Sequence, residues 1–331
     1  MKFPVEKNLE VFSGENSIRD FLNPNNHSPT PLVELPKSLN PFLNSGVRIY
    51  AKCEYLRPLL NIKSLQVLGM LEDAQNSGKL SGVHTLVENT SGNTGFSLGI
   101  ISKIFGIPNV ELIVPYDIAP GKLEMLRLIG AQIEPCKTDG IEKAKEIGNQ
   151  KGFFNLNQYW NEANPDAIEK WLAPQIWEQT QGKLTVFCSG LGTTGTILGV
   201  ERFLEKKEAK TSIVGVKLAP DHAIPGVRTS KKLEEISFDW WSEIDYQIEV
   251  KTKESYKKSL ELCRVGLIAG PSSGFVLAGL IKFLKSQCTQ RNNKLDNFRN
   301  KNNEVVAVFI CADTPFPYLD KYSTILDPSD F

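Results

Sequence analysis

Short apolar runs alternate with longer helix-permissive segments between residues 85 and 148. The runs that favour strands are 85–87, 110–115 and 132–135, and the segments that favour helices are 96–105, 121–129 and 141–148. Strands and helices in regular alternation are typical of a parallel sheet with covering helices. Ahead of this region, the pattern predicts a short helix near 17–22, an extended segment at 28–35, a strand at 47–54, and a helix that passes through 71–74 and ends near Gly78.

The second half of the chain repeats this alternation. Its predicted helices are 168–179, 197–208 and 275–286, and its predicted strands are 183–188, 212–218 and 305–310. Residues 289–304 are rich in Asn, Lys and Arg and are predicted to form a solvated surface loop or insertion. We therefore expect an α/β fold with two lobes of parallel type and a cleft between them, where a ligand would bind.

Composition narrows the class of protein. With 331 residues the chain is long enough for two domains. Its 38 Lys and Arg residues balance its 38 Asp and Glu residues, and no basic stripe indicates a nucleic-acid partner. The N-terminal segment lacks the apolar core of a signal peptide and no apolar run is long enough to span a bilayer, so we expect no membrane partner. Three dispersed histidines and six cysteines without a CxxC pair argue against a metal site and favour a reduced, cytoplasmic protein.

The stretch Glu88–Gly95, which reads Glu-Asn-Thr-Ser-Gly-Asn-Thr-Gly, lies between a predicted strand and a predicted helix. Its hydroxyl and amide groups gather where free backbone N–H groups and the positive end of a helix dipole meet. Gly92 and Gly95 allow the backbone to come close to a ligand. The stretch therefore predicts a site for a small anion such as a carboxylate. The alternative is an ordinary strand–helix turn that is rich in capping residues.

Lys63 is flanked by apolar residues at the start of a predicted helix. Desolvation and the helix N-terminus would lower the pKa of its amine, as a Schiff-base nucleophile requires. The alternative is a surface lysine whose stem covers apolar neighbours while its amine stays in water.

A second glycine-rich stretch, Cys188–Thr196, also lies between a predicted strand and a predicted helix. Its glycines free the backbone, and its threonines add hydroxyl groups, which suits a phosphate at the start of the helix. The stretch lacks the Lys-Ser/Thr ending of a nucleotide P-loop, so a nucleoside triphosphate is not supported. The alternative is a turn without a ligand.

Two further candidates carry less information by themselves. Ser272, in Gly270–Gly274, precedes a predicted helix and would equally serve as its cap. Gln158 follows the apolar pair at 153–154, where it either reaches a ligand or satisfies a turn.

In this order and at these spacings, the stretches resemble the fold-type II pyridoxal-phosphate enzymes, and within them the cysteine synthase and cystathionine β-synthase family. The resemblance runs from about Ser28 to Leu319, and its most specific signal is Thr-Ser-Gly-Asn-Thr-Gly at 90–95. It implies a fold like that of tryptophan synthase β, with pyridoxal 5′-phosphate in the cleft between two lobes. It also implies a smaller lobe at 47–151 that carries the carboxylate loop, and a larger lobe at 1–46 and 152–331 that carries the phosphate loop.

The family pattern implies a role for each residue that matches it. Lys63 would hold the cofactor as an internal aldimine and move the α-proton of the substrate. The remaining cofactor-binding residues would be Asn93 at the pyridine 3′-oxygen, Ser272 at the pyridine nitrogen, and Gly192, Thr193, Thr194, Gly195 and Thr196 around the phosphate. The substrate α-carboxylate would be held by Thr90, Ser91, Gly92, Thr94 and Gln158. This agrees with the anion site predicted from the residues themselves.

The reaction that the resemblance implies is β-replacement on an activated L-serine of the O-acetylserine or O-phosphoserine type. Loss of the leaving group would give an aminoacrylate, and a nucleophile would then add to form cysteine or a related β-substituted alanine. We expect amino-acid substrates and a homodimer. One alternative is a β-eliminating lyase of the serine/threonine dehydratase or cysteine desulfhydrase type, although the dehydratases usually carry Ser-x-Gly-Asn-His where this chain has Asn93 and Thr94. A further alternative is a non-catalytic regulatory homologue.

The chain departs from the family pattern in several places. The Gly, Ser, Asp and Arg that usually surround the lysine are replaced within 57–65, Thr194 stands where Gly is common, and Pro317 stands where Arg is usual. These departures indicate an outlying branch whose second substrate need not be sulfide. Arg228, in the unusual segment Ile224–Thr229, would either neutralise an extra acidic group on a substrate or belong to a surface loop, and we prefer the second interpretation.

Overall fold

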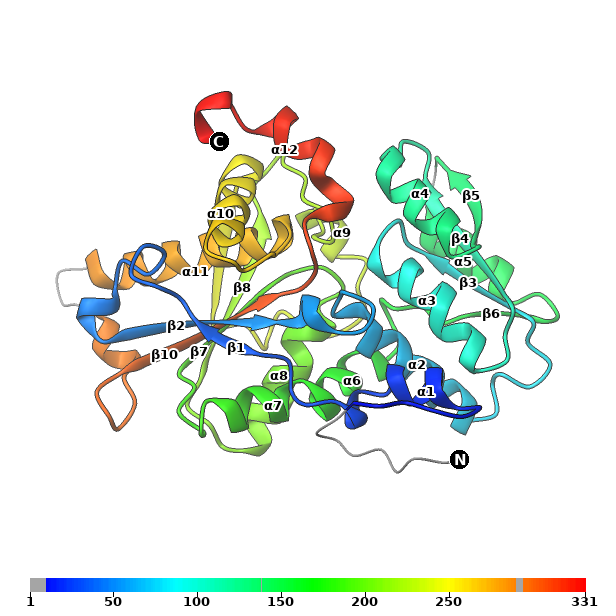
Figure 1. Cartoon of the computed structure of the whole chain (residues 1–331), viewed down its shortest axis with the longest axis horizontal. Coiled ribbons are helices and arrows are strands. Elements are labelled where there is room, and N and C mark those ends of the chain that lie inside the picture. The colour runs from blue at the N-terminus through cyan, green and yellow to red at the C-terminus, as the bar shows by residue number, and fades with distance from the viewer. Residues whose placement is uncertain (1–9, 138, 290–293) are drawn as a thin grey trace.

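The computed structural model describes residues 10–137, 139–289 and 294–331 (Figure 1). Two sequence predictions fall at least partly outside these residues: the absence of a signal peptide at the N-terminus and the surface loop at 289–304. Within them, no helix is long and apolar enough to cross a membrane.

The larger of two sheets has six strands in the order β1-β2-β10-β7-β8-β9. The strands are β1 (Leu32–Glu34), β2 (Val47–Cys53), β7 (Val186–Gly190), β8 (Ser212–Leu218), β9 (Tyr246–Val250) and β10 (Val305–Cys311). All neighbouring pairs are parallel except β1 and β2. Every residue of β10 is buried, as expected for a strand that is covered by helices on both faces of a parallel sheet.

The smaller sheet has four parallel strands in the order β5-β4-β3-β6. They are β3 (Thr85–Asn89), β4 (Asn109–Pro115), β5 (Gln132–Cys136) and β6 (Phe153–Asn155). Figure 1 shows this sheet with α3 (Asn93–Ile104), α4 (Pro120–Leu128) and α5 (Gly140–Gly148) at one end of the molecule. The predicted α/β class with parallel sheets is confirmed.

Strand pairing differs from the predicted lobe boundaries at both ends of the smaller lobe. β2 was assigned to the smaller lobe, but it pairs with β10 along its whole length, from Val47 beside Val305 to Cys53 beside Cys311. β6 was assigned to the larger lobe, but it pairs with β3. An apolar run identifies a strand without naming its partner, so the boundaries at 47 and 151 were placed too early for both strands. Whether the two sheets form separate domains stays a prediction.

The helices mostly match the predicted segments. The remaining ones are α1 (Ser17–Leu22), α2 (Lys63–Asn76), α6 (Ala163–Trp171), α7 (Ala173–Gln179), α8 (Gly195–Lys206), α9 (Ser230–Leu233), α10 (Thr252–Arg264), α11 (Pro271–Thr289) and α12 (Leu319–Ile325). The single helix predicted at 168–179 is two helices that meet at Leu172. Pro174 explains the break, because proline has no N–H to continue the ladder and disfavours helical geometry at the preceding residue.

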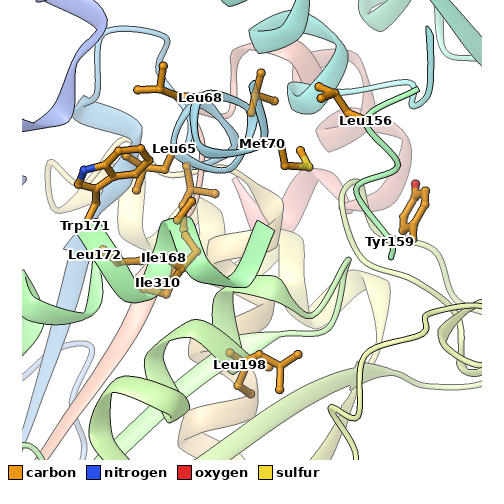
Figure 2. Packing of buried hydrophobic residues seen from close by; sticks show 14 of the residues in the cluster. Leu65, Leu68, Met70, Leu156, Tyr159, Ile168, Trp171, Leu172, Leu198 and Ile310 are labelled. Atoms are coloured by element: carbon orange, nitrogen blue, oxygen red, sulfur yellow. The ribbon is translucent and has the colours of Figure 1, made fainter. Parts of the chain in front are cut away.

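A shared apolar core fixes α2 against the helices of the larger sheet. Figure 2 shows Leu65 and Met70 of α2 near Ile168 and Trp171 of α6, with Leu198 of α8 below them, and all five are buried. Burying side chains of this size contributes roughly 1.5–3 kcal/mol each. The start of α2, which carries Lys63, is therefore held in place by packing on its other turns.

Candidate active site

The N-terminal ends of four helices meet at one cavity. Lys63 begins α2, Asn93 begins α3, Thr194 immediately precedes α8, and Ser272 is the second residue of α11. All four line this cavity, which adjoins a second cavity of about 320 Å³. Free N–H groups and the positive ends of helix dipoles favour anions at such a place.

Lys63 lines the first cavity, and its amine donates a hydrogen bond to Thr193 Oγ1 at 3.1 Å. Burial lowers the pKa of Lys63 from its ordinary value of 10.5 to about 8. No carboxylate forms an ion pair with it within 4 Å among the described residues. The environment thus raises the fraction of the amine that is neutral, the form that Schiff-base chemistry needs.

The loop before α8 is the glycine-rich stretch for which the sequence predicted a phosphate. A Cβ at Gly192 would lie 2.5 Å from the Gly226 carbonyl oxygen, and one at Gly195 would lie 2.1 Å from Asn164 Oδ1. The backbone contact requires glycine at 192, and a Cβ at 195 would displace the buried side chain of Asn164. Thr194 has a φ of +63°, in the left-handed region. Its buried Oγ1 has no hydrogen-bond partner among the described residues. An unsatisfied buried hydroxyl at the start of a helix fits a ligand phosphate oxygen.

Asp313 joins the two residues that were predicted to face the cofactor ring. Its Oδ2 accepts hydrogen bonds from Asn93 Nδ2 at 2.7 Å and from the Tyr318 hydroxyl at 2.6 Å, and its Oδ1 accepts one from Ser272 Oγ at 3.3 Å. The side chain is only 4% exposed, and burial raises the pKa of Asp313. The carboxyl of Asp313 therefore orients the amide of Asn93 and the hydroxyl of Ser272 through these hydrogen bonds.

All five predicted carboxylate-binding residues line the second cavity, which contains Thr90, Ser91, Gly92, Thr94 and Gln158 together with Lys63. Thr94 Oγ1 donates to Gln158 Oε1 at 2.8 Å, and Gln158 Nε2 donates to the Asn89 carbonyl at 3.2 Å. Gln158 thus ties the start of α3 to the end of β3. The structure brings these residues together, and their part in binding a substrate stays a prediction.

Glu88 lies at the base of this loop with 1% of its surface exposed. Burial raises the pKa of Glu88 to about 8, although backbone N–H groups of 157, 158 and 89 act in the opposite direction. The side chain is therefore mainly neutral at pH 7. The sequence interpretation included Glu88 in the stretch but gave it no role.

Arg228 is not the exposed loop residue that we preferred from the sequence. Its side chain is 13% exposed, and its guanidinium lies over the Tyr159 ring at 4.2 Å. It lines the second cavity together with Lys122. The sequence pattern gave no role to Lys122 or to Asp313. For Asp313 a signal existed, since a carboxyl just beyond a buried parallel strand lies at the edge where α/β sheets bind ligands.

Comparison with known proteins agrees with this geometry. The pyridoxal-phosphate dependent enzyme family matches residues 24–294. Cysteine synthase B of Salmonella typhimurium is 32% identical over 78% of this chain and 86% of its own, and cysteine synthase A of Escherichia coli is 30% identical over 84% and 88%. The crystal structure of cysteine synthase from Entamoeba histolytica superposes with a TM-score of 0.76 at 25% identity, over 91% of this chain and 89% of that one.

The chain therefore belongs to the pyridoxal-phosphate dependent enzyme family. It is an enzyme of the cysteine synthase type whose cofactor is pyridoxal 5′-phosphate, which confirms the predicted resemblance and cofactor. The roles of individual residues, the donor and the nucleophile do not follow from these similarities.

Proposed function

We propose that this chain catalyses β-replacement on an activated L-serine of the O-acetylserine or O-phosphoserine type and forms cysteine or a related β-substituted alanine. One observation supports the proposal most directly. Lys63, the phosphate-type loop at 192–196 and the carboxylate-type loop at 90–94 line two adjoining cavities. Relatives that are named cysteine synthases support the same reaction class.

The described residues fit pyridoxal 5′-phosphate. We infer that its phosphate is held by Gly192, Thr193, Thr194, Gly195 and Thr196, since the loop offers, at a helix start, a buried hydroxyl that has no partner within the described part of the chain. Asn93 would donate to the 3′-oxygen, Ser272 would face the pyridine nitrogen, and Lys63 would be the covalent attachment point. When bound, the cofactor supplies an electron sink for the bonding electrons at the substrate α-carbon.

The protein's own part in the reaction is to orient the substrate and to move one proton. Thr90, Ser91, Gly92, Thr94 and Gln158 would hold the α-carboxylate and so direct the α-hydrogen and the leaving group. The Lys63 amine would accept the α-proton. The Cβ–O bond then breaks, and its electron pair leaves with acetate or phosphate. A nucleophile forms the new bond to Cβ with its own electron pair, and Lys63 returns the proton to Cα.

The test is a visible absorption titration of the cofactor-loaded protein with O-acetylserine, O-phosphoserine, serine and cysteine. The proposal predicts that one of the first two changes the cofactor's absorption band, and that sulfide, a thiol or an amine then restores it with release of a new amino acid. Lys63→Ala should abolish the response. Lys79→Ala is the matched control, because Lys79 is exposed in the turn that follows the other end of the same helix. A loaded protein that responds to no donor, or a Lys63→Ala variant as active as the parent, would overturn the proposal.

We also propose a homodimer on the strength of the family resemblance alone. Light scattering of the eluting protein should give twice the 36.9 kDa of one chain. A mass of one chain would contradict it.

A further inference from the structure

Helix α6 packs unusually closely on α2 and α8. A Cβ at Gly69 of α2 would lie 2.5 Å from the Ala167 Cβ, and a Cβ at Gly199 of α8 would lie 2.3 Å from the Pro165 carbonyl oxygen. Both glycines therefore allow α6 to approach the backbones of its two neighbours. Asn164, the second residue of α6, is fully buried at this point. Its short side chain can therefore reach both neighbouring helices.

The amide of Asn164 forms three hydrogen bonds, each to a different segment of the chain. Its Nδ2 donates to the Gln158 carbonyl at 2.6 Å and to Thr193 Oγ1 at 3.2 Å. Its Oδ1 accepts a hydrogen bond from Gln66 Nε2 on α2. Because a backbone carbonyl can only accept, the contact with Gln158 fixes which end of the amide is Nδ2. Asn164 therefore presents a donor to the phosphate-type loop.

The hydroxyl of Thr193 lies between two donors. Its Oγ1 accepts hydrogen bonds from Lys63 Nζ at 3.1 Å and from Asn164 Nδ2. A hydroxyl oxygen can accept two hydrogen bonds and donate one, so both acceptor positions are filled and the O–H must point elsewhere. In the part of the chain that the structure describes, this hydroxyl donates to no protein atom, and Thr193 lines both cavities. Its hydrogen is thus available to a ligand.

We propose that Asn164 is a positioning residue of the cofactor site, which orients the Thr193 hydroxyl so that its hydrogen is donated to the cofactor phosphate. Lys63 would be attached to the cofactor in the loaded protein, so Asn164 is then the donor that keeps Thr193 in this orientation. A group that is oriented before binding loses little freedom when the ligand arrives. The inference rests on the phosphate role of residues 192–196 in the proposed function and does not depend on the donor or the nucleophile.

The test compares two compounds that differ in one group. Pyridoxal 5′-phosphate and pyridoxal share the ring and the aldehyde, and only the first carries a phosphate. Visible titration of the apoprotein gives the affinity for each, and a change in their ratio between variants reports on the phosphate. Asn164→Ala should lower this ratio by about 10-fold, within the range for a hydrogen bond to a charged group. A variant with general structural damage would lose affinity for both compounds and keep the ratio.

Two variants of Thr193 show whether the effect of Asn164 passes through this hydroxyl. Thr193→Ser keeps the hydroxyl and should keep the ratio of the parent. Thr193→Val removes it and should lower the ratio by about 10- to 100-fold. In the Thr193→Val background, Asn164→Ala should change the ratio by less than about 2-fold. Equal effects of Asn164→Ala in both backgrounds would overturn the proposal, because Asn164 would then act without Thr193.

Asn161→Ala is the matched control. Asn161 lies just before α6 and donates to the Leu156 carbonyl at 2.9 Å, and it is not among the residues that line either cavity. Its loss should lower Tm and leave the ratio unchanged.

A second variant serves if Asn164→Ala yields no folded apoprotein. Asn164→Asp has nearly the same size, and its carboxylate would accept the Thr193 hydrogen in competition with the phosphate. The ratio should again fall by about 10-fold or more. An unchanged ratio in Asn164→Asp would overturn the proposal.

The outcomes separate this inference from the proposed function. An Asn164→Ala variant with the ratio of the parent, in an enzyme that responds to a serine donor, would overturn the inference and leave β-replacement intact. A lowered ratio in a protein that responds to no donor would support the inference and overturn β-replacement. Equal affinity of the parent for the two compounds would overturn the inference together with the phosphate role of residues 192–196.

Discussion

Replacing Thr194 with glycine should raise the stability of the apoprotein and lower its affinity for the cofactor. A φ of +63° is costly for a side chain with a Cβ, by about 1–2 kcal/mol, and the buried hydroxyl without a partner adds about 1–3 kcal/mol. Thr194→Gly removes both costs. The greater freedom of glycine in the unfolded chain returns about 0.5–1 kcal/mol. We expect the apoprotein to gain about 2 kcal/mol in the free energy of unfolding, which is a rise of about 3 °C in Tm.

The same substitution should weaken cofactor binding. The hydroxyl that is unsatisfied without ligand would donate to the cofactor phosphate, and a hydrogen bond to a charged group is worth about 1.5–3 kcal/mol. Affinity for pyridoxal 5′-phosphate should therefore fall by about 10-fold or more in Thr194→Gly. The assays are thermal unfolding of the apoprotein and a visible titration with the cofactor.

Thr194→Ala and Thr194→Ser divide the two effects. Alanine keeps the Cβ in the left-handed region and loses the hydroxyl, so its apoprotein should gain less than the glycine variant and its cofactor affinity should fall equally. Serine keeps the hydroxyl and should bind the cofactor like the parent. A Thr194→Gly apoprotein less stable than the parent, or one with unchanged cofactor affinity, would refute the reasoning.

The remaining predictions concern three titratable residues. Burial lowers the pKa of Lys63 to about 8. The rate of cofactor uptake by the apoprotein, followed by stopped-flow absorbance, should therefore rise with pH around a midpoint near 8. A midpoint near 10 would show that the pKa of Lys63 is not lowered. Asp313→Ala leaves the Asn93 amide and the Tyr318 hydroxyl without their acceptor. Affinity for the cofactor should therefore fall by about 10- to 100-fold. An unchanged visible titration with the cofactor would show that Asp313 has no part in binding it. Glu88 binds its proton more tightly when folded, with a pKa of about 8 against 4.5, so its contribution to stability is present at low pH and is lost as the pH rises from about 4.5 to 8. The denaturant midpoint of Glu88→Gln relative to the parent should therefore increase over that window, and a constant difference would show that Glu88 titrates normally.

Local elements could be predicted from the sequence because each depends on neighbours along the chain. The apolar period placed β4 and α5 within one or two residues, and the turn before α3 was identified by its glycines and hydroxyls. Sheet membership of β2 could not be predicted, since its partner β10 lies more than 250 residues away. The pattern of Val47–Cys53 suits an inner strand of either sheet.

The sequence placed Lys63 and Ser272 at the starts of helices, and both residues line the first cavity, while their chemical roles stay a prediction. The parts of the site that depend on distant side chains could not be predicted. Asp313 contacts Asn93 and Ser272 only in the folded chain, because these two residues belong to other elements. Arg228 is half-buried with its guanidinium over the Tyr159 ring, and no spacing along the chain predicts that contact.

The proposed function depends on Lys63 being the residue that carries the cofactor. Borohydride reduction of the loaded protein fixes the cofactor to its lysine, and peptide mass spectrometry then locates the added pyridoxyl group. We expect this mass on the peptide that contains Lys63, and we expect it to be absent from the Lys63→Ala variant. The same mass on Lys122, the other lysine of the cavities with a pKa lowered by burial, would contradict it.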